Sequence, residues 1–265
     1  MSKTDPTGTR QALSYASYLA LDELLDAQRP RSDEHDELLF IVIHQVYELW
    51  FKQLLHETRY LQENLEAGRT AHATRTLRRI LTVLKVVVEQ IDVLETMTPS
   101  QFSSFRARLD ASSGFQSAQF RELEAVLGRR DERVLTHYPE DSAQRKRIVD
   151  AMSRPSLFDS FLTYLAESGY SLPRRADVTR PVEPSPDLQA VLLKVYRDDG
   201  GQSVVAEHMV DLDEGMQEWR YRHVKMVERT IGDKTGTGGS SGATYLRSTL
   251  FRPMFPDLWA VRSQL

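Results

Sequence analysis

The chain has 265 residues, with 34 Lys and Arg against 38 Asp and Glu, a formal net charge of -4, and no cysteine. This charge balance indicates no nucleic-acid partner, which would need a clustered basic face. Without cysteine there are no disulfides, thiolate ligands or iron–sulfur clusters, so any metal must be held by His, Asp, Glu or a cofactor. The N-terminus lacks the apolar core of a secretory signal, and no apolar run approaches the roughly 20 residues that span a bilayer. We therefore expect a cytoplasmic protein with no membrane association.

The first half of the chain predicts helices. Apolar residues have helical spacing in Leu13–Asp26. No helix breaker interrupts Asp36–Glu66, whose first half is apolar on every side and therefore expected to be buried, and Gly68 is expected to form its C-terminal cap. An amphipathic stripe runs through Ala71–Met97 and stops at Thr98–Pro99.

The second half continues this pattern. Apolar residues keep helical spacing in Ser117–Gly128, and prolines confine Arg129–Pro186 to loops and short helices such as Leu157–Glu167. Gln202–Ile231 predicts a long helix with an apolar seam that packs against other helices, followed by a stretch rich in glycine and hydroxyl residues, 233–243. No convincing run of alternating strands occurs, so we predict an all-α fold in a single domain over residues 1–265.

His44 and His223 each stand where the helical pattern predicts a hydrophobe. A hydrogen-bonded core histidine is the more common explanation for one such residue. Two of them on separate apolar helices favour a functional role, because a neutral imidazole among hydrophobes suits the axial position of a haem iron. Neither His-Glu-x-x-His nor Glu-x-x-His occurs, which disfavours zincin and di-iron sites. Since Cys-x-x-Cys-His is also absent, the remaining haem option is noncovalent and histidine-ligated.

Other polar residues of these segments have weaker signals. Arg106 could be a fork for a substrate carboxylate, although most arginines lie on solvated faces. Glu48, one turn after His44, could orient that imidazole or could equally form an exposed salt bridge. Tyr15 and Tyr18 are compatible with ordinary core or interface positions.

Six short motifs follow one another along the chain, namely Tyr18–Gln28, His35–Gln45, Glu48–Lys52, Ser113–Ser117, Arg222–His223 and Gly236–Gly242. Together they resemble the tryptophan 2,3-dioxygenase family over nearly the whole chain. Because several independent motifs occur in the right order, the resemblance is far more specific than any single glycine-rich loop.

The resemblance implies an all-helical enzyme built on long helices around a haem pocket, with noncovalent haem b as cofactor and Fe(II) as its active form. It implies a homotetramer. The implied reaction inserts both atoms of dioxygen across the indole C2–C3 bond of L-tryptophan and gives N-formyl-L-kynurenine, the first step of tryptophan catabolism by the kynurenine route.

The resemblance also assigns roles to residues on the two long helices. His223 matches the proximal ligand of the haem iron, and His44 matches the distal catalytic histidine that hydrogen-bonds the indole N–H. Phe40 matches a ring that packs on the indole. Three further residues of the same helix are assigned to the pocket wall: Ile41, Val42 and Ile43.

The remaining matches lie elsewhere in the chain. Arg106 matches the residue that pairs with the substrate carboxylate, and Thr237 matches a hydroxyl that helps to hold the substrate backbone, in a loop expected to close over it. Phe102 stands where some members have tyrosine, so a hydroxyl contact is lost while the pocket wall is kept. Tyr15 and Tyr18, within the N-terminal segment 1–30, resemble residues that a neighbouring subunit supplies.

Two other interpretations stay open. A haem mono-oxygenase of the same fold could act on an indole or phenolic amino acid in secondary metabolism, and its product would carry one oxygen atom from dioxygen instead of two. A non-catalytic helical binding protein could keep His44 and His223 as core residues, and such a protein would be colourless and would not take up haemin.

Overall fold

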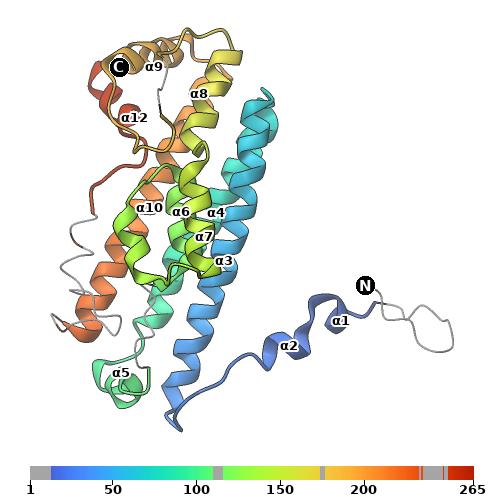
Figure 1. The fold of residues 1–265 in the computed structure, drawn as a ribbon, viewed down its shortest axis with the longest axis vertical. Coiled ribbons are helices and arrows are strands. Elements are labelled where there is room, and N and C mark those ends of the chain that lie inside the picture. Colours follow the sequence, from blue (N-terminus) through green and yellow to red (C-terminus); the bar gives the residue numbers. More distant parts are fainter. Residues whose placement is uncertain (1–12, 110–115, 174–176, 233, 235–246, 248–249) are drawn as a thin grey trace.

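Three long helices form the centre of the molecule. The computed structural model describes residues 13–109, 116–173, 177–232, 234, 247 and 250–265. Every regular element in these ranges is a helix, which confirms the predicted all-α fold. The long helices α3 (His35–Glu66), α4 (Thr70–Leu94) and α10 (Gly201–Ile231) run alongside one another (Figure 1).

Shorter helices cover the bundle and its two ends. The helix α5 (Pro99–Arg106) lies at the end where α3 begins and α10 finishes, and α9 (Pro186–Asp198) and α12 (Pro256–Ala260) lie at the opposite end (Figure 1). The other short elements are α1 (Tyr15–Leu19), α2 (Leu21–Leu25), α6 (Ala118–Leu127), η2 (Glu132–His137), α7 (Ala143–Ser153), α8 (Leu157–Glu167) and η3 (Val261–Gln264).

Local capping explains where several helices begin and end. The side chain of Thr98 accepts a hydrogen bond from the backbone N–H of Gln101, whose side chain bonds back to Thr98, and Pro99 occupies the first turn of α5. The predicted stop at Thr98–Pro99 is therefore also the start of a helix that the sequence pattern did not predict. The C-cap of α3 is Ala67, and Gly68, expected to be the cap, follows it with a φ of +67°, the position where helices commonly end in a left-handed glycine.

Two segments differ from their predictions. The helix α9 was not predicted, because Pro186 was interpreted as a breaker, whereas it occupies the first turn, where its fixed φ and missing N–H cost nothing. The predicted helix Leu13–Asp26 is divided into α1 and α2, because Ala20 adopts a φ of +50° between them.

One large apolar cluster joins α3, α4, α6, α8, α9, α10 and α12. The C-terminal segment is attached to it by the buried carboxylate of Asp213 on α10. Its Oδ2 atom accepts hydrogen bonds from the backbone N–H groups of Met254 and Phe255 and from the indole Nε1 of Trp259, at 2.8, 2.9 and 3.0 Å. A single domain over residues 1–265 stays a prediction.

The helix α3 has the length and apolar composition of a membrane span, the one such helix in the described ranges, contrary to the expectation from the sequence. It nevertheless packs against α4, α6 and α8. Its buried face also carries Glu57, whose carboxylate pairs with Arg79 at 3.1 Å and accepts a hydrogen bond from Gln53 at 2.8 Å. The expectation that the first half of α3 is buried on every side is wrong, because Leu38, Val42 and Leu49 are 49 %, 37 % and 49 % exposed.

Candidate functional site

The two histidines singled out from the sequence lie on the two outer helices of the central layer. His44 is on α3 and His223 is on α10, and both are half-buried. The helix α4 packs closely against both α3 and α10, whereas α3 and α10 approach each other at isolated points only. Large side chains reach across the space between them, as in the edge-to-face pair of Phe51 and Trp219, whose ring centroids lie 6.1 Å apart.

The protonation of His44 follows from its hydrogen bond. Its Nδ1 lies 2.7 Å from the carbonyl oxygen of Phe40, one turn earlier on α3. A carbonyl oxygen can only accept, so Nδ1 carries the proton and donates. Burial lowers the pKa of His44, although the carbonyl bond and the charge of Glu48 oppose this. The ring is therefore neutral near pH 7, and its Nε2 presents a lone pair that can accept a hydrogen bond.

Aromatic rings surround His44 on the side of α5. The centroid of the Phe40 ring lies 4.1 Å from that of the imidazole and 5.7 Å from the ring centroids of Phe102 and Phe105. Phe102, Phe105 and Ile43 are buried in the same apolar cluster. This wall offers a flat apolar surface beside a single hydrogen-bond acceptor, which suits a ligand that is aromatic and has one N–H group.

His223 is held by stacking. Its ring lies parallel to the indole of Trp219, with 5.1 Å between centroids and 7° between planes. Burial, with the charges of His44 and Arg121, lowers the pKa of His223 to about 4. The imidazole is therefore neutral near pH 7, and it makes no hydrogen bond with any described residue. A neutral imidazole with its lone pair uncommitted is what an axial metal ligand requires.

Sequence reasoning did not single out Trp219, which supports His223 from one turn away. Its indole packs on Phe120 at 4.5 Å between centroids, while its Nε1 and the hydroxyl of Tyr47 are buried without a hydrogen-bond partner in the described ranges. The spacing of four residues between Trp219 and His223 on one helix face could have indicated the pair.

These residues fit a histidine-ligated haem. No group of three His, Asp or Glu lies together in the described part of the chain. A haem does not need one, because a single axial imidazole and an apolar surround are sufficient protein ligation. His223 supplies the imidazole, the aromatic residues supply the surround, and the buried donors of Trp219 and Tyr47 are available to polar groups of a bound molecule.

The other predicted site residues are placed less closely together. Arg106 is the last residue of α5 and is half-buried. On α3, Ile41 is half-buried, whereas Val42 is 37 % exposed. Successive helical residues point about 100° apart, so Ile41, Val42 and Ile43 cannot all face one pocket of the same subunit. Thr237 lies outside the described residues.

Two further expectations concern neighbours of the histidines. The carboxylate of Glu48 accepts a hydrogen bond from Gln119 on α6 at 2.8 Å, so Phe40, not Glu48, orients His44. Tyr15 and Tyr18 lie on α1, in an arm that extends away from the bundle (Figure 1), and are 78 % and 74 % exposed.

Comparison with known proteins shows the family of the chain. The family model for tryptophan 2,3-dioxygenase matches residues 3–168 and 185–265. The chain belongs to the tryptophan 2,3-dioxygenase family. It is 65 % identical over 266 residues to the tryptophan 2,3-dioxygenase of Anaeromyxobacter sp. (strain K), covering 99 % of this chain and 100 % of that protein. It is 57 % identical over 260 residues to the tryptophan 2,3-dioxygenase of Herpetosiphon aurantiacus, covering 96 % of this chain and 99 % of that protein.

The resemblance predicted from the six motifs is thereby confirmed, and with it the expected enzyme class, an oxidoreductase. As a member of the tryptophan 2,3-dioxygenase family, the chain is an enzyme and not the non-catalytic helical protein considered from the sequence.

Proposed function

We propose that the chain is a haem-dependent enzyme that converts L-tryptophan and dioxygen into N-formyl-L-kynurenine. The observation that carries this proposal is the arrangement of two neutral histidines, in which His44 presents an acceptor at Nε2 and the lone pair of His223 is uncommitted. The family assignment supplies the substrate, because relatives that match the whole chain are named tryptophan 2,3-dioxygenases.

His223 would hold haem b through its uncommitted ring nitrogen. When bound, the haem supplies the binding and activation of dioxygen. Trp219, stacked on the imidazole at 5.1 Å, fixes the ring plane and excludes water from that side. Because burial keeps the pKa of His223 near 4, a proton does not compete for this nitrogen near pH 7.

His44 would orient the indole. With Nδ1 bonded to the carbonyl of Phe40, Nε2 accepts a hydrogen bond from the indole N–H and fixes which edge of the ring faces the haem. Phe40 and Phe102 pack against the indole faces and exclude water. Much of the acceleration would come from this positioning, since orientation alone can contribute about 7–11 kcal/mol to lowering a barrier.

Arg106 and Thr237 would select an amino acid over free indole. The guanidinium of Arg106 at the end of α5 matches the planar geometry of a carboxylate and binds it through two parallel hydrogen bonds. The hydroxyl of Thr237 would contact the amino acid backbone. Of the three helix residues expected in the pocket wall, Ile43 is kept in the proposed wall, because it is buried in the same apolar cluster as Phe102.

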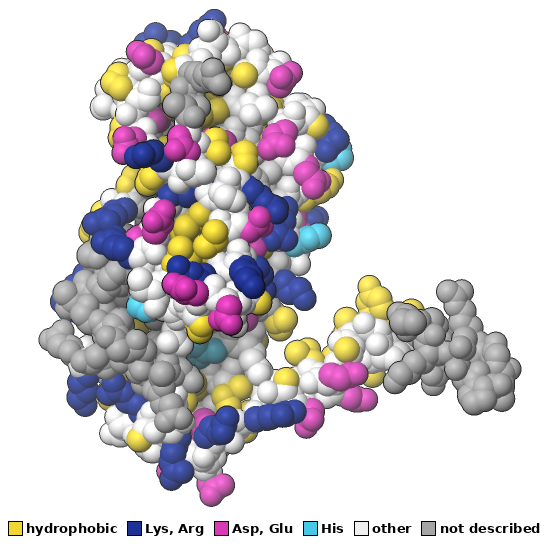
Figure 2. All heavy atoms as spheres, in the orientation of Figure 1, with side chains coloured by type: hydrophobic (Ala, Val, Ile, Leu, Met, Phe, Trp, Pro, Cys, Tyr) yellow, Lys and Arg dark blue, Asp and Glu magenta, His cyan; other side chains and the backbone are white. Residues whose placement is uncertain are grey.

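The N-terminal arm would complete the site of a neighbouring subunit. None of the residues of α1 and α2 is buried, and apolar side chains crowd the arm (Figure 2). Its most exposed large apolar residues are Tyr15, Leu13, Tyr18 and Leu25, at 78 %, 76 %, 74 % and 71 %. Such a surface is stable when it is covered by another chain. We propose a homotetramer, soluble and located in the cytoplasm.

Haem spectroscopy tests this function. The reduced holoenzyme, given L-tryptophan and dioxygen, should develop the absorbance of N-formylkynurenine. His223→Ala should lose the haem Soret band or shift it strongly, and external imidazole should restore it in part, since the aromatic surround remains. A His223→Ala protein with an unaltered haem spectrum, or a purified wild-type protein that takes up no haemin, would contradict the proposal.

A further inference from the structure

A pocket of about 280 Å³ lies at the C-terminal end of α6, and none of its wall residues belongs to the candidate site. Its walls come from the chain that follows α6, from residues 181–182 and from residues 252–254. Four arginines line it, with Asp131 as the acidic wall residue; the arginines are Arg129, Arg130, Arg133 and Arg252. Its composition is therefore strongly cationic.

The turn that ends α6 brings the arginines together. Gly128 adopts a φ of +117°, and an added Cβ would come within 3.3 Å of Val182. Beyond this turn, the guanidinium of Arg130 donates to the carbonyl oxygens of Ala125, Val178 at 3.3 Å and Arg154 at 2.8 Å. Arg130 therefore joins the turn after α6 to the segments around Val178 and Arg154.

The carboxylates near the pocket are already paired with arginines, two of them wall residues of the pocket. Asp131 accepts two hydrogen bonds from the guanidinium of Arg133, at 2.8 and 2.9 Å. Glu124 is shared by three guanidinium groups, at 2.7 Å from Arg121, 3.0 Å from Arg129 and 2.9 Å from Arg220. The wall arginine Arg129 thus has a fixed position between two carboxylates, since its Nη2 also lies 3.9 Å from Oδ2 of Asp131.

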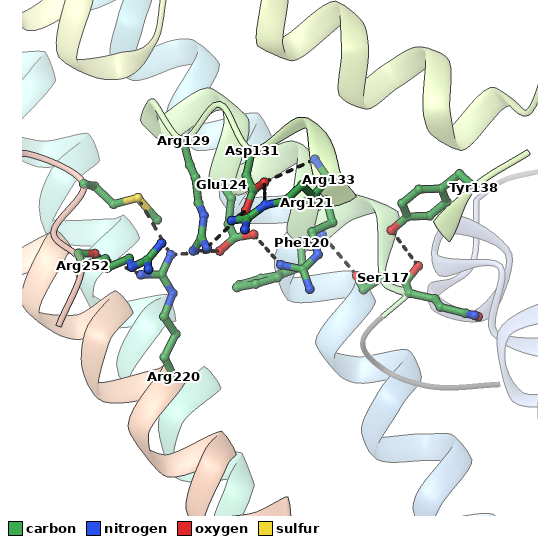
Figure 3. A network of polar contacts seen from close by, with 12 residues as sticks. Ser117, Phe120, Arg121, Glu124, Arg129, Asp131, Arg133, Tyr138, Arg220 and Arg252 are labelled. Carbon is green, nitrogen blue, oxygen red and sulfur yellow. Dashed lines mark hydrogen bonds and ion pairs between the residues drawn. The ribbon is translucent and has the colours of Figure 1, made fainter. Parts of the chain in front are cut away.

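Arg252 completes the cationic wall. Its side chain makes no hydrogen bond or ion pair with any residue of the described ranges, whereas its backbone is held firmly. The carbonyl of Arg252 accepts from the buried Arg220 at 3.3 Å, and the nearby N–H of Met254 donates to Asp213 at 2.8 Å. Arg129, Arg220 and Arg252 lie on one side of Glu124, while Arg121 approaches it from the other (Figure 3).

We propose that this pocket binds a small organic carboxylate, with the guanidinium of Arg252 receiving its charged group. A guanidinium fork matches the two oxygens of a carboxylate. The apolar wall formed by Val182, Pro253 and Met254 receives the hydrocarbon body of the ligand. The volume of about 280 Å³ is at the lower end of known ligand sites, which limits the ligand to a small molecule. This inference does not depend on the proposed reaction.

Benzoate is a suitable probe, with neutral benzamide as its isostere. We expect sodium benzoate to raise the melting temperature of the wild-type protein saturably against sodium chloride of equal ionic strength, because a ligand that binds only the folded state stabilises it. Benzamide should give no saturable rise. A wild-type protein with no saturable response to benzoate, or with equal responses to benzoate and benzamide, would overturn the proposal.

Two variants locate the site. Arg252→Ala should weaken benzoate binding by about tenfold or more, and Arg252→Lys, which keeps the charge but not the fork, should lie between Arg252→Ala and the wild type. The exposed Arg75→Ala on α4 is the matched control and should bind as the wild type does. If Arg252→Ala keeps full affinity, or if Arg106→Ala loses binding instead, benzoate occupies another site and the proposal is wrong.

Discussion

The imidazole Nδ1 of His44 donates a hydrogen bond to the carbonyl oxygen of Phe40 over 2.7 Å. This contact fixes the tautomer of the ring, since a carbonyl cannot donate and burial keeps the ring neutral. It also places the imidazole beside the Phe40 ring, with 4.1 Å between the ring centroids. Phe40 therefore supplies both the carbonyl that orients the imidazole and an apolar surface beside it.

Nε2 of His44 is the proposed acceptor of the indole N–H. Removal of the imidazole should therefore reduce the preference for substrates that carry this N–H. We expect His44→Ala to retain haem and to lower kcat/KM for L-tryptophan by about tenfold to a hundredfold, the effect of losing one buried hydrogen bond. The wild type should prefer L-tryptophan to 1-methyl-L-tryptophan, which lacks the N–H, and His44→Ala should lose this preference. A variant that retained the full preference would refute the role of His44.

The proposed contact with the substrate carboxylate should depend on Arg106 and not on Arg108, the other arginine at the end of α5. Arg106→Ala should raise KM for L-tryptophan by about tenfold to a hundredfold with haem retained, because a charge-assisted hydrogen bond is lost. The exposed Arg108→Ala should have little effect on KM. The affinity for tryptamine, which has no carboxylate, should be equal in Arg106→Ala and the wild type; an equal loss for both ligands would indicate a structural defect instead.

The N-terminal arm should matter to assembly and not to the stability of its own subunit. Tyr15 and Tyr18 are 78 % and 74 % exposed, so Tyr15→Ser combined with Tyr18→Ser removes no contact within the chain's own core. We expect the oligomer to dissociate at higher protein concentration than the wild type and the KM for L-tryptophan to rise. Light scattering measures the first effect. An unchanged mass together with unchanged kinetics would show that the arm does not reach a neighbouring site.

The buried Glu124 should make the fold sensitive to acid. Desolvation would raise the pKa of this carboxyl, but the surrounding charges of Arg121, Arg220 and Arg129 lower it from 4.5 to about 2. A group with a lowered folded-state pKa contributes stability above its unfolded pKa and loses it as pH falls through the folded value. The contribution, on the order of 3 kcal/mol, should therefore be complete above pH 4.5 and disappear towards pH 2.

Denaturant unfolding at several pH values tests this effect. Glu124→Gln should be strongly destabilised at pH 7, because three arginines lose their shared charge, and the difference from the wild type should shrink between pH 4.5 and pH 2. The exposed Glu63→Gln is a control for a carboxylate without these partners. A difference between Glu124→Gln and the wild type that stayed constant with pH would show that the charge of Glu124 is not what stabilises the fold.

The sequence predicts the long helices well and the side-chain contacts between helices poorly. The bounds of α8 are as predicted, and α3 and α10 each begin within one residue of their predicted starts, because apolar periodicity and capping are local signals. The unusual positions of His44 and His223 were also visible locally.

Contacts between distant segments were not predicted. The indole of Trp219 packs on Phe120, Gln119 donates a hydrogen bond to the carboxylate of Glu48, and Arg220 shares Glu124 with two arginines of the α6 region. These partners are separated from one another by turns of helix or by other helices, and no periodic pattern specifies which side chain of one helix meets which of the next. Roles for Arg106 and Thr237 came from the family resemblance and not from spacing.

Labelled dioxygen tests the central proposal most directly. The reduced holoenzyme is given L-tryptophan under isotopically labelled dioxygen in ordinary water, and the product mass is measured before it can exchange or hydrolyse. Two labelled oxygen atoms in N-formyl-L-kynurenine are the predicted result, since both atoms enter across the indole C2–C3 bond. A product with one labelled atom would identify a mono-oxygenase of the same fold and contradict the proposed reaction.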